Sequence, residues 1–125
     1  MPDGFRHSSQ TLITGQRVGD PKLANRLSRA VEGDVFFDAP SRGRYSTDAS
    51  IYQIEPIGIV RPKSITDVEA VIKIAAEEGL PVLPRGGGTS QCGQTVAEAI
   101  VLDTSMYMNS IYDINSESKT AKVAP

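Results

Sequence analysis

The chain has 125 residues and a net charge of −2. This length is enough for one hydrophobic core but too short for two full domains. Apolar residues make up 39% of the chain and charged residues 22%, so the composition is that of a folded globular protein and excludes a disordered one. The acidic balance, without interleaved basic and aromatic residues, argues against nucleic-acid binding.

The single cysteine, Cys92, cannot form an internal disulfide, which is typical of a cytoplasmic protein. No apolar run approaches the ~20 residues that a membrane span needs, and the N-terminus lacks the apolar core of a secretory signal. The chain stops at Pro125, directly after a predicted strand, so we expect a piece of a longer protein. A peripheral position of that longer protein on the inner face of a membrane is left open.

The first part of the chain is expected to contain one helix. Residues 1–19 carry turn formers and little periodicity, and we predict a flexible arm. Residues 20–55 should hold a helix followed by an ordered irregular segment. Asp20 suits the N-cap of this helix, Pro21 suits its first position, and Gly33 is expected to end it.

Residues 56–125 alternate strand and helix signals. Strands are expected at 57–60, 80–84 and 99–103. A helix should lie between the first two strands, with Ser64 and Asp67 as a capping box and Gly79 at its end. The apolar stripe predicted for this helix comprises Ile65, Val68, Val71, Ile72 and Ala75.

The order of these elements predicts the fold class. A strand, a helix and a strand in succession favour parallel pairing through a crossover connection. Residues 111–114 and 120–123, joined by a polar turn, predict an antiparallel hairpin. We therefore expect an α/β (α+β) fold, with a small parallel β-α-β layer, flanking helices and the start of an antiparallel sheet.

Three consecutive glycines, Gly86–Gly88, follow the second predicted strand. Ligands of open α/β sheets bind beyond the carboxyl ends of parallel strands. Glycine reaches positive φ without steric cost and lets a ligand approach the backbone, so this run suits an anion-binding nest, with Thr89 and Ser90 adding hydroxyl donors. Glycine-rich turns after strands also occur without any ligand. From the glycines alone, a phosphate site and a structural turn are equally open.

Two familiar phosphate loops are excluded. No lysine followed by serine or threonine comes after the glycines, as a P-loop requires, and the spacing is not G-x-G-x-x-G opening a helix. Arg85, just before the glycines, suits either a charge for an anion or a solvated strand end.

Other side chains with possible chemistry favour structural roles. Cys92 has no histidine nearby, because the only one, His7, lies in the predicted arm, so a nucleophilic thiol is disfavoured. One cysteine cannot hold zinc or an iron–sulfur cluster by itself, and we predict no metal site. The carboxylates that follow strands or precede turns favour capping over acid–base chemistry; they are Asp38, Asp48 and Asp103. Residues 42–45 suit a solvated loop more than an anion contact, and Met106 and Met108 suit packing.

From Tyr45 onward the chain resembles the FAD-binding domain of the vanillyl-alcohol oxidase superfamily, the PCMH-type domain. The segments that carry the resemblance are, in order, YSTDASIY, VRPKSITDV, GLPVLPRGGGTS and IVLDTSMYMNSIYDIN. They are most similar to the branch of the glycolate oxidase subunit and of D-lactate or D-2-hydroxyglutarate dehydrogenase. The segment QCGQT resembles large bacterial flavoproteins that fuse this domain to an iron–sulfur segment. The resemblance implies that any such cluster lies outside this chain.

The resemblance implies that residues 56–125 are the N-terminal part of a FAD-binding domain whose glycine loop wraps the pyrophosphate. The implied phosphate donors are the backbone or hydroxyl groups of Gly86, Gly87, Gly88, Thr89 and Ser90. The implied wall toward the flavin comprises Gly93, Gln94 and Thr95, and the flanking residues are Pro84 and Arg85. Some members of the superfamily place in this loop a histidine that bonds covalently to the flavin. Thr89 and Ser90 stand there in this chain, so non-covalent FAD is expected.

The activity that the resemblance implies is FAD-dependent oxidation of a D-2-hydroxy acid such as D-lactate, glycolate or D-2-hydroxyglutarate, with electrons passing to an unidentified acceptor. An oxidase that uses oxygen is an alternative, as is a non-catalytic α/β module whose glycine loop is only structural. No catalytic residue is assigned, because those that choose the substrate are expected in an absent C-terminal domain. The isolated chain is expected to bind FAD weakly, to turn over no substrate and to self-associate through an exposed sheet edge.

Overall fold

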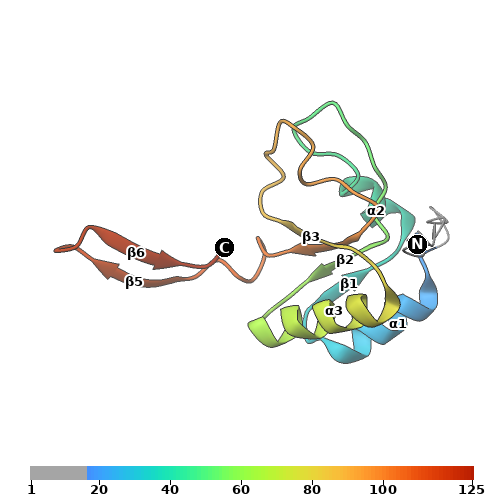
Figure 1. The fold of residues 1–125 in the computed structure, drawn as a ribbon, viewed down its shortest axis with the longest axis horizontal. Coiled ribbons are helices and arrows are strands. Elements are labelled where there is room, and N and C mark those ends of the chain that lie inside the picture. Colours follow the sequence, from blue (N-terminus) through green and yellow to red (C-terminus); the bar gives the residue numbers. More distant parts are fainter. Residues whose placement is uncertain (1–16) are drawn as a thin grey trace, which may run out of the picture.

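The computed structural model describes residues 17–125, which form a four-stranded sheet with helices against it and a separate two-stranded hairpin (Figure 1). In chain order the elements are α1 (Pro21–Ala30), β1 (Asp34–Phe36), α2 (Ala39–Arg44), β2 (Gly58–Arg61), α3 (Ile65–Glu78), β3 (Val82–Arg85), β4 (Ile100–Asp103), β5 (Ile111–Asn115) and β6 (Thr120–Val123). The predicted α/β class, with an antiparallel hairpin at its end, is confirmed.

The strand order in the sheet is β1-β2-β4-β3. Both β2 and β3 pair in parallel with β4, and β1 pairs with β2 in antiparallel orientation. The predicted parallel layer is therefore confirmed, but β2 and β3 are not neighbours, because β4 lies between them. The predicted burial of the strand at 80–84 is wrong: β3 forms an edge and is only half-buried, whereas every residue of β4 is buried.

The core lies on both faces of the sheet. Helices α1 and α3 cover one face (Figure 1); the fully buried residues on that side include Leu23, Leu27, Val60, Val71 and Ile100. On the other face Tyr45, Ile59 and Val101 pack together with the half-buried Phe36 and Leu83. Successive residues of β2 and β4 thus contribute to opposite faces, as strand geometry dictates.

Helix α3 has the predicted ends. The Ser64 hydroxyl accepts the N–H of Asp67 at 3.3 Å, and Gly79 caps the other end with φ of 66°. The predicted capping box is wrong in its second half, because the buried Asp67 carboxylate accepts other backbone N–H groups, those of Glu32, Gly33 and Lys63, at 2.9 to 3.0 Å. Asp67 therefore joins the turn after α1 to the start of α3.

The buried stripe of α3 is rotated from the predicted one. Ile65 and Ile72 are 66% and 52% exposed, whereas Ile74 is buried beside Val71 and Ala75. Apolar residues at helical spacing offer two overlapping stripes on this helix, and packing against the sheet and α1 selects one of them.

The segment after α1 is more regular than predicted. Helix α1 ends at Ala30 rather than at Gly33, and a Cβ at Gly33 would lie 2.0 Å from the carbonyl oxygen of Arg61. Glycine is thus required there by the close approach of two backbones, not by a helix end. The segment predicted to be irregular contains β1 and α2, and Asp38 caps α2 by accepting the N–H of Ser41 at 2.9 Å.

Most of the predicted arm, residues 1–19, lies outside the described residues, and so does His7. Its last three residues are held in place: Arg17 donates to Asp20 at 2.8 Å and to Glu78 at 3.0 Å, and the N–H of Gly19 donates to the Ile57 carbonyl at 2.9 Å.

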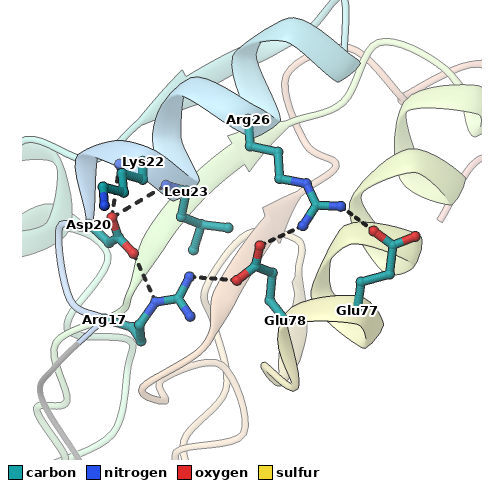
Figure 2. Close-up of polar contacts among 7 residues, drawn as sticks. All are labelled: Arg17, Asp20, Lys22, Leu23, Arg26, Glu77 and Glu78. Atoms are coloured by element: carbon teal, nitrogen blue, oxygen red, sulfur yellow. Dashed lines mark hydrogen bonds and ion pairs between the residues drawn. The ribbon is translucent and has the colours of Figure 1, made fainter.

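A chain of ion pairs joins the start of α1 to the end of α3. Figure 2 shows Arg17 between Asp20 and Glu78, and Arg26 facing both Glu77 and Glu78. Asp20 also accepts the N–H groups of Lys22 and Leu23, which confirms it as the N-cap of α1. The hydrogen bonds from Arg17 and then Arg26 lower the pKa of Glu78, so its carboxylate stays charged in this network.

The β5–β6 hairpin projects from the rest of the molecule, and all of its strand residues are exposed (Figure 1). Among residues 17–125, no helix is long and apolar enough to cross a membrane.

Candidate functional site

The parallel strands β2, β3 and β4 end at the same edge of the sheet, with Arg61, Arg85 and Asp103 as their last residues. Two loops lie side by side beyond this edge (Figure 1): the glycine loop, residues 86–99, and the flanking loop, residues 45–56. The carboxyl edge of parallel strands is where ligands bind in open α/β sheets. The predicted location of the site is therefore matched by the fold.

Two glycines of the glycine loop are required by the protein itself. Gly88 and Gly93 have φ of 66° and 80°, the left-handed region that side chains rarely adopt. A Cβ at Gly88 would lie 2.6 Å from Nη2 of Arg85, and a Cβ at Gly93 would lie 2.6 Å from the Tyr52 ring. Both positions are thus fixed by backbone conformation and by a neighbouring side chain.

Gly86 and Gly87 have no such requirement. Neither has a positive φ. A Cβ at Gly86 would meet nothing within 4 Å, and one at Gly87 would meet only the methyl carbon of Thr89, at 3.6 Å. Nothing in residues 17–125 explains why both positions are glycine. A group that binds close to the backbone, in the space that two Cβ atoms would enter, does explain it.

The same stretch offers hydrogen-bond donors. Within the described part of the chain, the backbone N–H groups of residues 86–90 donate to no other protein group. Backbone N–H groups of folded proteins normally find a partner. Consecutive N–H groups at the end of a parallel strand suit the negatively charged oxygens of a phosphate. The residues present therefore fit a diphosphate.

The polar side chains further along the loop bind within the protein. The Ser90 hydroxyl contacts the Gln94 side-chain oxygen and accepts the N–H groups of Cys92 and Gln94 at 3.4 and 3.3 Å. The Thr95 hydroxyl donates to Asp48 at 2.8 Å. The phosphate contact predicted for Ser90 stays a prediction, because this structure uses its hydroxyl inside the loop. Cys92 is exposed.

Arg85 is not the solvated strand end that one alternative proposed. Its Nη1 donates to the carbonyl oxygens of Tyr45 and Thr95 at 3.3 and 3.0 Å, and its Nη2 donates to that of Thr47 at 2.8 Å. The guanidinium carbon lies 5.2 Å from the centre of the Tyr45 ring. The guanidinium therefore faces the carbonyls of the two loops.

A buried polar network, which the sequence did not indicate, lies under the site. The Tyr45 hydroxyl donates to the Asp103 carboxylate and accepts from Nε and Nη2 of Arg61 at 3.1 and 3.0 Å. Asp103 also accepts from the N–H and hydroxyl of Ser105 at 2.9 and 2.6 Å, which confirms its predicted role as a cap of the next turn. An arginine that ends an otherwise apolar strand was the available signal for this network.

The network shifts two pKa values in opposite directions. Burial, and then the hydrogen bond to Asp103, raises the pKa of Tyr45. Burial on its own would raise the pKa of Asp103 as well, but hydrogen bonds from Ser105 and Tyr45, together with the charge of Arg61, outweigh it, and the pKa of Asp103 is lowered. At neutral pH the network thus holds a neutral phenol between a carboxylate and a guanidinium.

Asp48 links the two loops. It was predicted to cap a helical turn, but its carboxylate accepts the N–H of Ser50 at 2.8 Å and the Thr95 hydroxyl. Hydrogen bonds from Ser50 and then Thr95 lower its pKa to about 2. The solvated loop predicted for residues 42–45 is wrong: residues 42–44 end α2, Tyr45 is buried, and Arg42 contacts Glu55 and the Phe37 carbonyl. Residues 17–125 hold no cluster of three or more acidic, cysteine or histidine side chains suited to a metal ion.

An apolar cavity of about 370 Å³ adjoins the free N–H groups. Gly86 forms part of its wall, together with Pro84 at the end of β3 and Ile65 and Val68 on α3. Met108 also lines it and is half-buried, as the predicted packing role requires, but Met106 is 49% exposed, so the packing predicted for Met106 is wrong.

Comparison with known proteins places the chain in a family. Residues 56–125 match the family described as FAD binding domain. The chain is 40% identical over 94 residues to the D-2-hydroxyglutarate dehydrogenase of Escherichia coli (strain K12), covering 73% of this chain and 9% of the relative. It is 35% identical over 99 residues to the glycolate oxidase subunit GlcD of Bacillus subtilis (strain 168), covering 76% of this chain and 21% of the relative.

The fold is shared with solved structures of other proteins. BBE-like 1 of Physcomitrella patens superimposes with a TM-score of 0.65 at 19% identity, over 81% of this chain and 22% of that one. The chain spans only 9% of the length of the Escherichia coli dehydrogenase and 21% of the length of the Bacillus subtilis GlcD subunit. The family match covers β2 to the end of the chain, which includes the free N–H groups and the glycine loop. The chain belongs to the FAD-binding-domain family.

Proposed function

We propose that this chain binds the pyrophosphate of FAD in a flavin-dependent dehydrogenase, and that the intact protein oxidises a D-2-hydroxy acid such as D-lactate, glycolate or D-2-hydroxyglutarate. The observation that carries the FAD proposal is the stretch of residues 86–90, whose backbone N–H groups are free beside two glycines with open space above them. The proposal of the substrate class is supported by the names of the similar enzymes, D-2-hydroxyglutarate dehydrogenase and a glycolate oxidase subunit.

The roles of the residues follow from the contacts described above. The N–H groups of residues 86–90 would bind phosphate oxygens, and the absence of side chains at Gly86 and Gly87 would let the diphosphate reach them. Ser90, Gln94 and Thr95 would keep the wall of the site in shape through their internal hydrogen bonds. When bound, FAD supplies the hydride-accepting chemistry. No histidine stands in the glycine loop, so the cofactor would be held without a covalent bond.

The two alternatives differ in how well this geometry supports them. A glycine loop that only turns the chain would need Gly88 and Gly93, but it would not need Gly86 or Gly87. The structural alternative is therefore the weaker one. An oxidase that passes electrons to oxygen shares the same FAD site with a dehydrogenase, so the choice between them depends on residues around the flavin ring.

The test of the FAD site is a Gly87→Asp substitution in the intact gene product. A carboxylate placed beside the free N–H groups would occupy them and repel a diphosphate, so the FAD content per polypeptide should collapse while the fold persists. Gly43→Asp is the matched control, since a Cβ at Gly43 meets nothing within 4 Å, a Cβ at Gly87 meets only the Thr89 methyl carbon at 3.6 Å, and the change in charge is the same. If FAD content is the same in both variants, the loop does not hold the cofactor.

Two further measurements test the rest of the proposal. Titration of FAD into the isolated 125-residue chain, followed by flavin fluorescence, should show weak binding; tight stoichiometric binding would contradict the claim that the chain supplies only part of the site. Anaerobic mixing of the intact protein with D-lactate, glycolate and D-2-hydroxyglutarate should bleach the flavin with at least one of them. If none of the three reduces a bound flavin, the substrate class is wrong.

A further inference from the structure

One arginine connects three separate stretches of chain at the site. Arg85 is the last residue of β3, and its guanidinium donates to the Tyr45 and Thr47 carbonyls of the flanking loop and to the Thr95 carbonyl of the glycine loop. Its own carbonyl accepts the N–H of Thr104, just after β4. The side chain of Arg85 therefore joins the two loops to the end of β3, while its backbone carbonyl pairs with the chain after β4.

The guanidinium also sets the conformation of Gly88. Its Nη2 lies 2.6 Å from the place where a Cβ of residue 88 would stand, so a side chain there would displace the guanidinium from its carbonyl acceptors. The Gly88 carbonyl in turn accepts the N–H of Ala49 at 3.2 Å, which ties the turn to the flanking loop. The left-handed turn at Gly88 thus contacts the Arg85 guanidinium and is hydrogen-bonded to Ala49. It directly follows Gly86 and Gly87, where the fold itself does not require glycine.

The contacts suit the rigid, planar guanidinium of an arginine better than the ammonium of a lysine. A guanidinium presents five N–H donors in a rigid plane, whereas a lysine ammonium is a point charge with three rotating donors. The Tyr45 ring lies against this plane at 5.2 Å. Tyr45 is itself fixed by the hydrogen bonds of its hydroxyl to Asp103 and Arg61.

We infer that Arg85 is a positioning residue: it shapes the glycine loop for anion binding through the carbonyls of Tyr45, Thr47 and Thr95, and it does not contact the phosphates itself. This inference rests on the proposed FAD site. It differs from the ordinary role of an arginine beside a phosphate, which is a direct charge-assisted hydrogen bond.

The test compares Arg85→Lys with Arg85→Met in the intact protein, by FAD affinity of the apoprotein and by hydrogen exchange of the Ala49 N–H without FAD. A direct phosphate contact would survive largely in the lysine variant, because lysine binds phosphate as a point charge. Positioning predicts that both variants lose affinity to a similar extent, by about tenfold or more. It also predicts faster exchange at Ala49 in both. Arg26→Lys and Arg26→Met are the controls for loss of an arginine, since Arg26 pairs with Glu77 and Glu78 of α3 and contacts neither loop.

Each result decides the matter. Near-normal FAD affinity in Arg85→Lys combined with a large loss in Arg85→Met overturns the inference in favour of a direct charge contact. Unchanged exchange at Ala49 in both variants also overturns it. If the wild-type protein holds no FAD, the proposed function fails, and the Ala49 exchange alone then decides whether Arg85 shapes the loop. If Arg85→Met does not fold, Arg85→Gln takes its place in the same comparison.

Discussion

Replacing Gly88 by alanine should destabilise the protein strongly, whereas the same change at Gly86 should not. Alanine in the left-handed conformation costs about 1–2 kcal/mol, and the Gly88 φ of 66° lies in that region. The new Cβ would also stand 2.6 Å from Nη2 of Arg85 and displace the guanidinium from its carbonyl acceptors. Because the guanidinium is only half-buried and water replaces part of what is lost, we count one net charged hydrogen bond, about 1.5–3 kcal/mol.

The expected loss at Gly88 is therefore about 2.5–5 kcal/mol of the free energy of unfolding. At Gly86 the chain has open space and no positive φ. Alanine there should leave stability unchanged or raise it by about 0.4–1 kcal/mol, because it restricts the unfolded chain.

Urea unfolding of the two variants, monitored by circular dichroism, measures this difference. In a domain of this size, a change of 1 kcal/mol moves the thermal midpoint by roughly 4 °C, so Gly88→Ala should melt well below wild type. FAD binding should fall in both variants, for different reasons. If Gly88→Ala is as stable as wild type, the contact between Gly88 and Arg85 does not hold the loop. A Gly86→Ala variant that loses more than about 1 kcal/mol would show that its surroundings are not open.

Two further predictions concern the polar contacts below and beside the loop. Tyr45→Phe should lower the free energy of unfolding by about 1–3 kcal/mol, because the buried Asp103 loses a donor and Arg61 an acceptor. Chemical denaturation measures this loss, with Tyr112→Phe, at an exposed tyrosine, as the control. Equal stability of the two variants would contradict the prediction. The pKa of Asp48 is lowered from 3.8 to about 2. The stability advantage of wild type over Asp48→Asn should therefore be complete above pH 3.8 and be lost as the pH falls from 3.8 to about 2. Thermal unfolding of both proteins from pH 5 to pH 2 follows this, and an advantage that grows on acidification would show that the folded state does not favour the Asp48 carboxylate.

Features that depend on a few neighbouring residues were predictable from the sequence. The caps Asp20, Asp38 and Ser64 and the left-handed Gly79 lie where expected, because each acts on N–H or carbonyl groups within one turn. The strand segments other than β1 were found because short apolar runs between turn formers identify them. The placement of the glycine loop followed from the end of one such strand.

Features that depend on distant contacts were not predictable. Nothing near β4 indicates that it lies between β2 and β3, because strand order is decided by pairing across the whole sheet. The choice between Ile72 and Ile74 for the core depends on how α3 packs against the sheet and α1. Gly33 follows a helix, which suggested a helix end. Glycine is required there because the backbone passes close to the carbonyl of Arg61, on β2.

The same division applies to the site. The sequence identified the glycines as one group, but only the structure separates Gly88 and Gly93, which the fold requires, from Gly86 and Gly87, which it does not. The flanking loop was expected to be ordered, but its contacts with Arg85 and Thr95 join residues about 40 positions apart or more. The spacing of residues along the chain does not predict such contacts.

The glycine loop is also the only link between the edge strand β3 and the central strand β4, and in the described chain it contains no helix. A connection between parallel strands needs about a dozen residues, and residues 86–99 provide this length. Contacts with the flanking loop fix its path, because the Gly88 carbonyl accepts the N–H of Ala49 and the Thr95 hydroxyl donates to Asp48. A ligand held there would stabilise the strand order of the whole sheet. A circular permutation that cuts the chain between residues 86 and 99 would separate the connecting role of the loop from its anion-binding role. The strands could still pair, but the anion-binding loop would be interrupted.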